Sequence, residues 1–385
     1  MGPNVNAFEK DLEAFVGQDK RVVALSAGTA AVHLSLIACG VKPGDEVCFA
    51  HTCFYHFFLA QRMKDNEEFK DKIIAPDSYY KNDRAVSYYA GLVRNDKKLL
   101  EFLLEDVDHY FKPAQAIYEN VNADDCFTYL YVGEKTFTPL ARSGVTQKIL
   151  DNKPTKEEVE KKLIKRCDEK LRKISDEIRS HEHKTPDLLI AMLADALKNL
   201  DGIEDIQLKA RVYDAIIRDG IIFTVVSKEA LADYANHNGG KLPMALSDVK
   251  NVPVFFRFMP LAFQQYLYNL LGTTKLTMIF RDKFNRDMSR DCTDIERFMS
   301  AGILWDCIHL GSYEEMRRLI KKVKNNVTKD YILLKLVHHY NEKVLSGSEE
   351  EQKYIKLFAA LEAKGKFLSL VEQKRIEQKV MPKKK

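Results

Sequence analysis

The chain has 385 residues, of which 45% are hydrophobic and 30% are charged, so it is long enough for two or three soluble globular domains. Its net formal charge of +4 is small and is spread over segments of mixed sign, which argues against a dedicated nucleic-acid-binding protein. The seven cysteines form no Cys-x-x-Cys pair, and the start of the chain has no secretory signal pattern. We therefore expect a cytoplasmic protein with reduced thiols, no disulfide framework and no membrane span.

The first 47 residues follow the pattern of an α/β domain. Asn6 is predicted to cap a helix over residues 7–16, and residues 21–25 have the composition of a short buried strand. A further helix is predicted over residues 29–38. The turn before this helix, Ser26-Ala-Gly-Thr29, would offer free backbone N–H groups at the positive end of a helix dipole, as a phosphate cradle does. A tight turn before a capped helix explains the same residues, so both interpretations stay open.

The stretch "GPNVNAFEKDLEAFVGQDKRVVALSAGTAAVHLSLIACGVKPGDEV" resembles the amino-terminal part of the DegT family of sugar aminotransferases. The resemblance implies the fold of type-I aminotransferases and a pyridoxal phosphate cofactor. In the family a Gly-Thr-Ala turn holds the cofactor phosphate, and here it matches Gly28, Thr29 and Ala30.

The rest of that enzyme is not recognisable in the chain. An aminotransferase of this type needs an aromatic ring on the cofactor, an aspartate on its pyridine nitrogen and a lysine that forms the Schiff base. Lys275 in "LGTTKLT" is the nearest local imitation, but it lacks a strand-to-helix setting. We therefore assign no catalytic residue and expect no cofactor, with pyridoxal phosphate as the cofactor if the chain is an aminotransferase.

After residue 47 the sequence becomes helical and rich in aromatic residues. The stretches "FAHTCFYHFFLAQRM" and "AVSYYAGLVRNDKKLLEFLLEDV" resemble the end of the winged-helix region and the following helical pair of NACHT-type STAND signalling NTPases. The second stretch is predicted to break near residues 94–96. The resemblance implies a nucleotide-sensing role for His51, although no phosphate-binding loop precedes it.

We predict a mainly α-helical protein, a bundle or solenoid-like array with a short α/β amino-terminal segment. The expected domains are an aminotransferase-like segment 1–47, a winged-helix end with a helical pair 48–112, an irregular connector 113–152 with a candidate strand in "CFTYLYVG", and an all-helical domain 153–385. No fixed repeat period is present. The helices of the last domain are predicted at residues 155–178, 187–200, 206–218, 228–237, 261–271, 293–309, 313–324, 329–344, 349–362 and 367–380.

Metal and hydrolase sites receive little support. Cys48, His51, Cys53 and His56 would point across more than half of one helix, so they are not expected to converge on a tetrahedral ion. The pair His181 and His183 is better explained as solvated loop residues. No nucleophile elbow or Cys/His nucleophile spacing is present.

The sequence thus favours a non-catalytic helical sensor or interaction scaffold that resembles the carboxy-terminal region of a STAND protein and carries a truncated aminotransferase-like amino terminus. The alternatives are a pyridoxal-phosphate sugar aminotransferase and a chimeric reading frame joined near residue 47. A protein partner or self-association is expected. The apolar stretch at residues 252–271 is either core or a partner surface, with core favoured.

Overall fold

A computed structural model of the chain describes residues 3–16, 22–23, 34–35, 38, 52–127, 140–142, 144–162, 183–247, 249, 252–308 and 313–366. The chain divides into two compact units, Met1–Thr52 and Cys53–Lys385. Each unit is described below by itself.

The first unit contains helix α1, Pro3–Val16. This helix begins four residues earlier than predicted, so Asn6 lies inside it and is not its cap. Pro3 stands at the first helical position, where its missing N–H costs no hydrogen bond. Val22 and Val23, in the predicted strand, are not in a strand, so the predicted α/β character is absent from the described part of this unit. Leu34, Ser35 and Ala38 are helical, as predicted.

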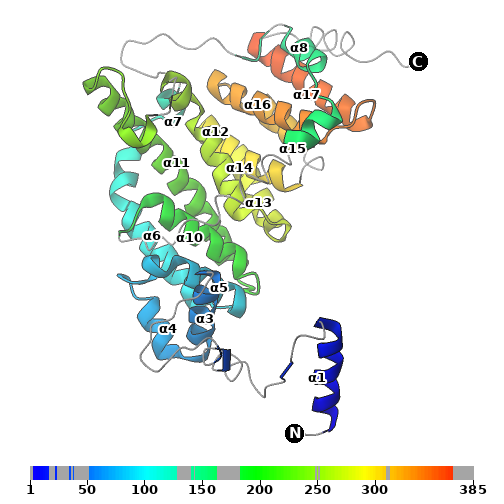
Figure 1. The fold of residues 1–385 in the computed structure, drawn as a ribbon. Coiled ribbons are helices and arrows are strands. Elements are labelled where there is room, and N and C mark those ends of the chain that lie inside the picture. The colour runs from blue at the N-terminus through cyan, green and yellow to red at the C-terminus, as the bar shows by residue number, and fades with distance from the viewer. Residues whose placement is uncertain are drawn as a thin grey trace. The chain divides into compact units, whose positions relative to one another are not determined.

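The second unit is built from helices, and no residue that the structure describes is in a β-strand, which confirms the mainly α prediction (Figure 1). From α3 to α8 the elements are α3 (Thr52–Asp65), α4 (Glu67–Ile73), η1 (Tyr79–Asn82), α5 (Asp83–Val93), α6 (Lys97–Tyr118), α7 (Ala123–Cys126) and α8 (Val145–Asp151). From α10 onward they are α10 (Pro186–Asn199), α11 (Ile206–His237), η2 (Met244–Leu246), α12 (Val252–Leu271), η3 (Thr274–Leu276), α13 (Thr277–Ser289), α14 (Asp294–Ile308), α15 (Tyr313–Lys322), α16 (Asn326–Lys343) and α17 (Glu349–Lys366).

One continuous hydrophobic core runs through this unit from Ala60 in α3 to Leu361 in α17. Helices close in sequence pack on one another, with α10 against α11, α13 against α14 and α16 against α17. Figure 1 shows the succession from α3–α5 at one end of the unit to α16 and α17 at the other. Within the described residues, no helix is both long and apolar enough to cross a membrane.

The predicted break near residues 94–96 is confirmed. Helix α5 ends at Val93, and the capping residue Arg94 adopts a left-handed conformation with φ 64°. Asp96 caps α6 by accepting a hydrogen bond from the Leu99 N–H at 3.0 Å. The Arg94 carbonyl accepts a hydrogen bond from the Gly202 N–H at 2.8 Å. A Cβ on Gly202 would lie 2.9 Å from that carbonyl oxygen, so the α5–α6 and α10–α11 connections meet there because residue 202 is glycine.

The predicted irregular connector was partly wrong. Pro113 does not end α6 but lies inside it, and the helix runs on to Tyr118. Cys126, the first residue of the candidate strand, belongs to the short helix α7. The remainder of that candidate, residues 128–133, lies outside the described residues.

Two predicted helices, 206–218 and 228–237, are one helix, α11. The first of them was predicted to end at residue 218, but the next two residues, Asp219 and Gly220, are buried within α11. A Cβ on Gly220 would lie 2.6 Å from Phe263 Cε1, so this glycine allows α12 to approach closely.

Helix α13 was missing from the predicted elements, and α12 begins nine residues before its predicted start and includes Pro260. The apolar stretch of α12 contributes to the core as favoured, because Phe256, Leu267 and Leu271 are fully buried. The predicted helix at residues 155–178 is helical where it is described, at residues 156–162. The one predicted at residues 367–380 lies outside the described residues.

Two helical glycines give opposite expectations for stability. A Cβ on Gly302 of α14 would lie 2.9 Å from Cδ of the fully buried Gln264, whereas one on Gly91 of α5 would meet nothing within 4 Å. We expect Gly302→Val to lower the free energy of unfolding by about 1–3 kcal/mol through overpacking. Gly91→Ala should raise it by about 0.5–1 kcal/mol, because alanine is the better helix former. Denaturant unfolding of the full chain measures both, and a stabilised Gly302→Val would contradict the packing.

Candidate functional site

The residues singled out for binding in the first unit, Gly28, Thr29, Ala30 and His51, lie outside the described residues. Their roles in holding a phosphate or sensing a nucleotide therefore stay predictions. Two of the four residues considered as zinc ligands are described: Cys53 is exposed and His56 is half-buried, both on α3. Nowhere in the described ranges do three or more His, Cys, Asp or Glu side chains come together as a metal site.

Lys275, the imitation of a Schiff-base lysine, is an exposed ion-pair partner. Its Nζ pairs with Asp201, which also accepts hydrogen bonds from Arg94 Nε at 2.7 Å and Nη2 at 2.8 Å. The bonds from Arg94 and Lys275 lower the pKa of Asp201 well below its ordinary value. The three residues therefore tie together the loops around α5, α10 and α12, and the exposed Lys275 ammonium group is engaged in an ion pair.

Several buried polar groups of the second unit lie on α14 or are bonded to it. At its start, Thr293 and Glu296 form a capping box, with the Thr293 N–H donating to Glu296 Oε2 at 2.8 Å. The next two N–H groups of the helix, those of Asp294 and Ile295, donate to Asp124 of α7 at 2.8 and 3.0 Å. The free donors of this helix end are thus satisfied by residues far away in sequence.

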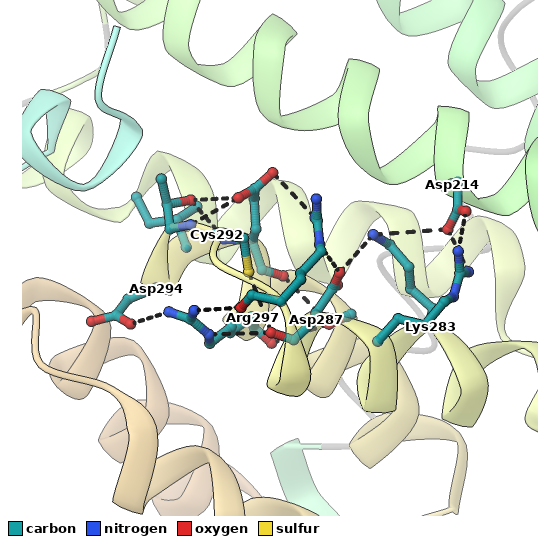
Figure 2. A network of polar contacts seen from close by, with 12 residues as sticks. Asp214, Lys283, Asp287, Cys292, Asp294 and Arg297 are labelled. Atoms are coloured by element: carbon teal, nitrogen blue, oxygen red, sulfur yellow. Dashed lines mark hydrogen bonds and ion pairs between the residues drawn. The ribbon is translucent and has the colours of Figure 1, made fainter. Parts of the chain in front are cut away.

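The Asp294 side chain continues this junction (Figure 2). Its carboxylate pairs with Arg297 at 2.9 Å. It also accepts the N–H groups of Lys324 and Asn325 at 2.6 and 2.7 Å. The loop before α16 is therefore fixed to the start of α14.

At the other end of α14, Asp306 collects partners from two more helices. Lys335 Nζ lies 2.6 Å and His339 Nε2 lies 2.9 Å from its oxygens, both from α16, and Gln264 Nε2 of α12 donates at 3.2 Å. Burial opposes ionisation of Asp306, but the bonds from His339 and Lys335 prevail and lower its pKa. Burial lowers the pKa of Lys335, although Asp306 favours its charged form.

A second buried pair joins α12 to α16. Arg257 and Asp330 are 2% and 0% exposed and form an ion pair at 2.5 Å. The other oxygen of Asp330 accepts the Leu140 N–H at 2.8 Å. Such pairs hold helices in register, since removing one partner would leave an uncompensated buried charge.

A charged cleft of about 520 Å³ lies between α6, α11, α13 and the start of α14. Figure 2 shows part of its wall, where Asp214 of α11 faces Lys283 and Asp287 of α13. The cleft is lined by Leu104, Asp108, Arg211, Asp214, Ala215, Ile217, Arg218, Ile221, Lys283, Arg286, Asp287, Arg290 and Glu296.

The carboxylates of the cleft are paired across helices. Arg286 donates to both oxygens of Asp214, at 2.7 and 2.9 Å. Lys283 and Arg290 both reach Oδ1 of the buried Asp287 at 2.9 Å. The Asp214 hydrogen bond is the main cause of the raised pKa of Arg286, so this guanidinium stays charged.

The cysteines near these clusters and the buried Asp306–His339 pair are unsuited to covalent catalysis. Burial raises the pKa of Cys292 to about 11 and that of Cys307 to about 12, so both thiols are protonated at neutral pH. The buried pair of Asp306 and His339 has Lys335 as its third member, a group whose charge is already engaged. The buried ion pairs therefore hold helices together, and charged side chains are accessible in the cleft.

Sequence reasoning missed this cleft because it has no local motif. Arg211, Asp214 and Arg218 share one face of α11 at spacings of three and four residues. The same spacing in Lys283, Arg286, Asp287 and Arg290 was a signal of a charged face on α13, but that helix was not predicted. The role of His339 was missed as well, because it depends on a partner distant in sequence, Asp306.

Comparison with known proteins bears on the first unit. The model of the DegT/DnrJ/EryC1/StrS aminotransferase family matches residues 1–57. That confirms the resemblance of the amino-terminal segment. The spore coat polysaccharide biosynthesis protein SpsC of Bacillus subtilis (strain 168) is 54% identical over 46 residues, which are 12% of this chain and 12% of that protein. The chain thus covers about an eighth of this relative, and no solved structure matches it.

Acidification tests the clamp at the end of α14. Burial lowers the pKa of His339 below 6.5, although Asp306 opposes this shift. The unfolded chain therefore binds the proton more readily, and stability that is complete above pH 6.5 is lost as the pH falls toward the folded-state pKa. We expect His339→Gln to weaken the pH dependence of the free energy of unfolding in that window.

The control is His237→Gln, because the His237 side chain is 75% exposed. Some pH dependence of the free energy of unfolding should remain in His339→Gln, because His56 also has a lowered pKa. Burial is the main cause of that shift, and the positive charge of Arg84 adds to it. Denaturant titrations on both sides of pH 6.5 measure the effect, and an unchanged slope in His339→Gln would contradict the assignment.

Proposed function

We propose that the helical unit is a non-catalytic sensor or interaction scaffold. In this proposal it resembles the carboxy-terminal region of a NACHT-type STAND protein and carries an aminotransferase-like amino-terminal segment. Its activity lies in what its surfaces bind.

The supporting observation is the use of the buried charges. Asp294, Asp306 and Asp330 all bridge separate helices or loops through ion pairs and backbone hydrogen bonds. A catalytic site would instead aim such groups at a substrate, with a nucleophile and base in mutual reach. Buried charges that join helices support a rigid scaffold.

An exposed aromatic surface supports a protein partner or a second copy of the chain as what the scaffold binds. Tyr55 and Phe57 of α3 are 48% and 36% exposed, and Tyr88 of α5 is 40% exposed. The rings of Phe57 and Tyr88 lie edge to face with centroids 6.4 Å apart, so the surface is continuous between the two helices. Aromatic residues are enriched where proteins bind one another.

A second candidate function, a pyridoxal-phosphate sugar aminotransferase, is favoured by the family match over residues 1–57. In that case Gly28, Thr29 and Ala30 would hold the cofactor phosphate. The reaction would need a lysine for the Schiff base, and the second unit offers Lys275 only as a partner of Asp201. The scaffold is therefore the preferred proposal.

An absorbance spectrum with pyridoxal phosphate distinguishes the scaffold from the aminotransferase. We expect the purified full chain, mixed with pyridoxal phosphate, to show no aldimine absorbance that borohydride converts to a stable lysine adduct, and no ATP turnover above a heat-denatured control. Circular dichroism recorded on the same sample would verify that the protein is folded. An aldimine trapped at one lysine would favour the aminotransferase, and sustained ATP hydrolysis would overturn the non-catalytic scaffold.

A further inference from the structure

The cleft between α6, α11 and α13 has the size of a small-molecule site, since its volume of about 520 Å³ lies in the usual range for ligand pockets. We propose that it binds a small anion, a ligand that carries a phosphate or carboxylate group. The proposal goes beyond the scaffold function and does not depend on it.

The charge of the wall is the first argument. Five cationic side chains line the cleft against four carboxylates. Four of the five cations are arginines, whose planar N–H donors match the oxygens of phosphate and carboxylate groups.

The second argument is the balance of hydrogen-bonding groups. Arg218 and Arg290 each hold their carboxylate partners through Nε and Nη2, and neither uses Nη1 on any residue that the structure describes. Arg286 donates to Asp214 through Nη1 and Nη2, and its Nε makes no hydrogen bond to any residue that the structure describes. The cleft therefore has donors in excess.

Arg211 adds a whole guanidinium to this excess. It is exposed at the cleft and has no ion pair or hydrogen bond from its side chain to any described residue. It stands one turn before Asp214, so it shares the α11 face that carries Arg218. A cation without a carboxylate partner in a cleft is suited to hold a ligand's negative charge.

Each of the four carboxylates of the cleft is bonded to at least one of its cations. Asp214 accepts Arg286 with both oxygens. Asp287 uses Oδ1 for Lys283 and Arg290, and its Oδ2 is buried without a partner among the described residues, so it is not presented to the cleft. Leu104 and Ile221 give the cleft an apolar side that would cover the body of an organic anion.

Thermal unfolding of the full chain at low ionic strength tests the proposal, with inorganic phosphate and citrate as the two probes and chloride at matched ionic strength as the reference. We expect a saturable rise of the unfolding temperature with at least one probe, because a ligand that binds the folded state stabilises it. A preference for phosphate or for citrate identifies the group that is bound.

The variants are Arg211→Gln in the cleft and Arg142→Gln outside it. Both residues are exposed, and neither side chain makes an ion pair to a described residue, so both variants should fold. Arg211→Gln should weaken anion binding about tenfold or more, and Arg142→Gln should leave it unchanged. The absence of any saturable shift, or equal binding by Arg211→Gln and the unaltered chain, would overturn the proposal.

Discussion

Helix α14 lies in the interior of the helical unit and carries a buried carboxylate near each end. Every residue of this helix from Asp294 to Asp306 except Glu296 is buried, and Trp305 and Phe298 are each 1% exposed. A helix that is surrounded on all sides has no solvent to satisfy its polar groups, so every buried charge must find a partner from another helix. The positions of α7, α12 and α16 follow from this requirement, because Asp124, Gln264, Lys335 and His339 supply those partners.

The same requirement separates structural charge from available charge. Asp294 and Asp306 have their bonding capacity filled by residues of the helical unit, so they contribute rigidity. In the neighbouring cleft each carboxylate is also bonded to a cation, but the arginines keep N–H donors that no described residue accepts. Excess donors on a rigid wall distinguish this proposed binding surface from another internal clamp.

Much of the fold could be predicted from the sequence, since the periodicity of apolar residues gave α10, α14, α15, α16 and α17 close to their observed bounds. The errors arose at a glycine and a proline, residue types that disfavour helix interiors, where the tertiary structure nevertheless keeps the chain helical. A helix was predicted to end shortly before Gly220 and an irregular connector to begin at Pro113, but Gly220 allows the approach of Phe263 and Pro113 is accommodated inside α6. The cleft could not be predicted in the same way, because its cations come from helices some 70 residues apart, as the pairing of Asp214 with Arg286 shows.

The most direct test is whether the helical unit unfolds as one body around α14. Trp305 is the only tryptophan of the chain, and it lies in α14 at 1% exposure, so its fluorescence reports on this helix alone. Denaturant unfolding of the full chain should be followed by this fluorescence and by far-ultraviolet circular dichroism on the same samples. The account predicts that the fluorescence change and the main loss of helix share one midpoint; a fluorescence transition clearly separated from the main loss of helix would contradict it.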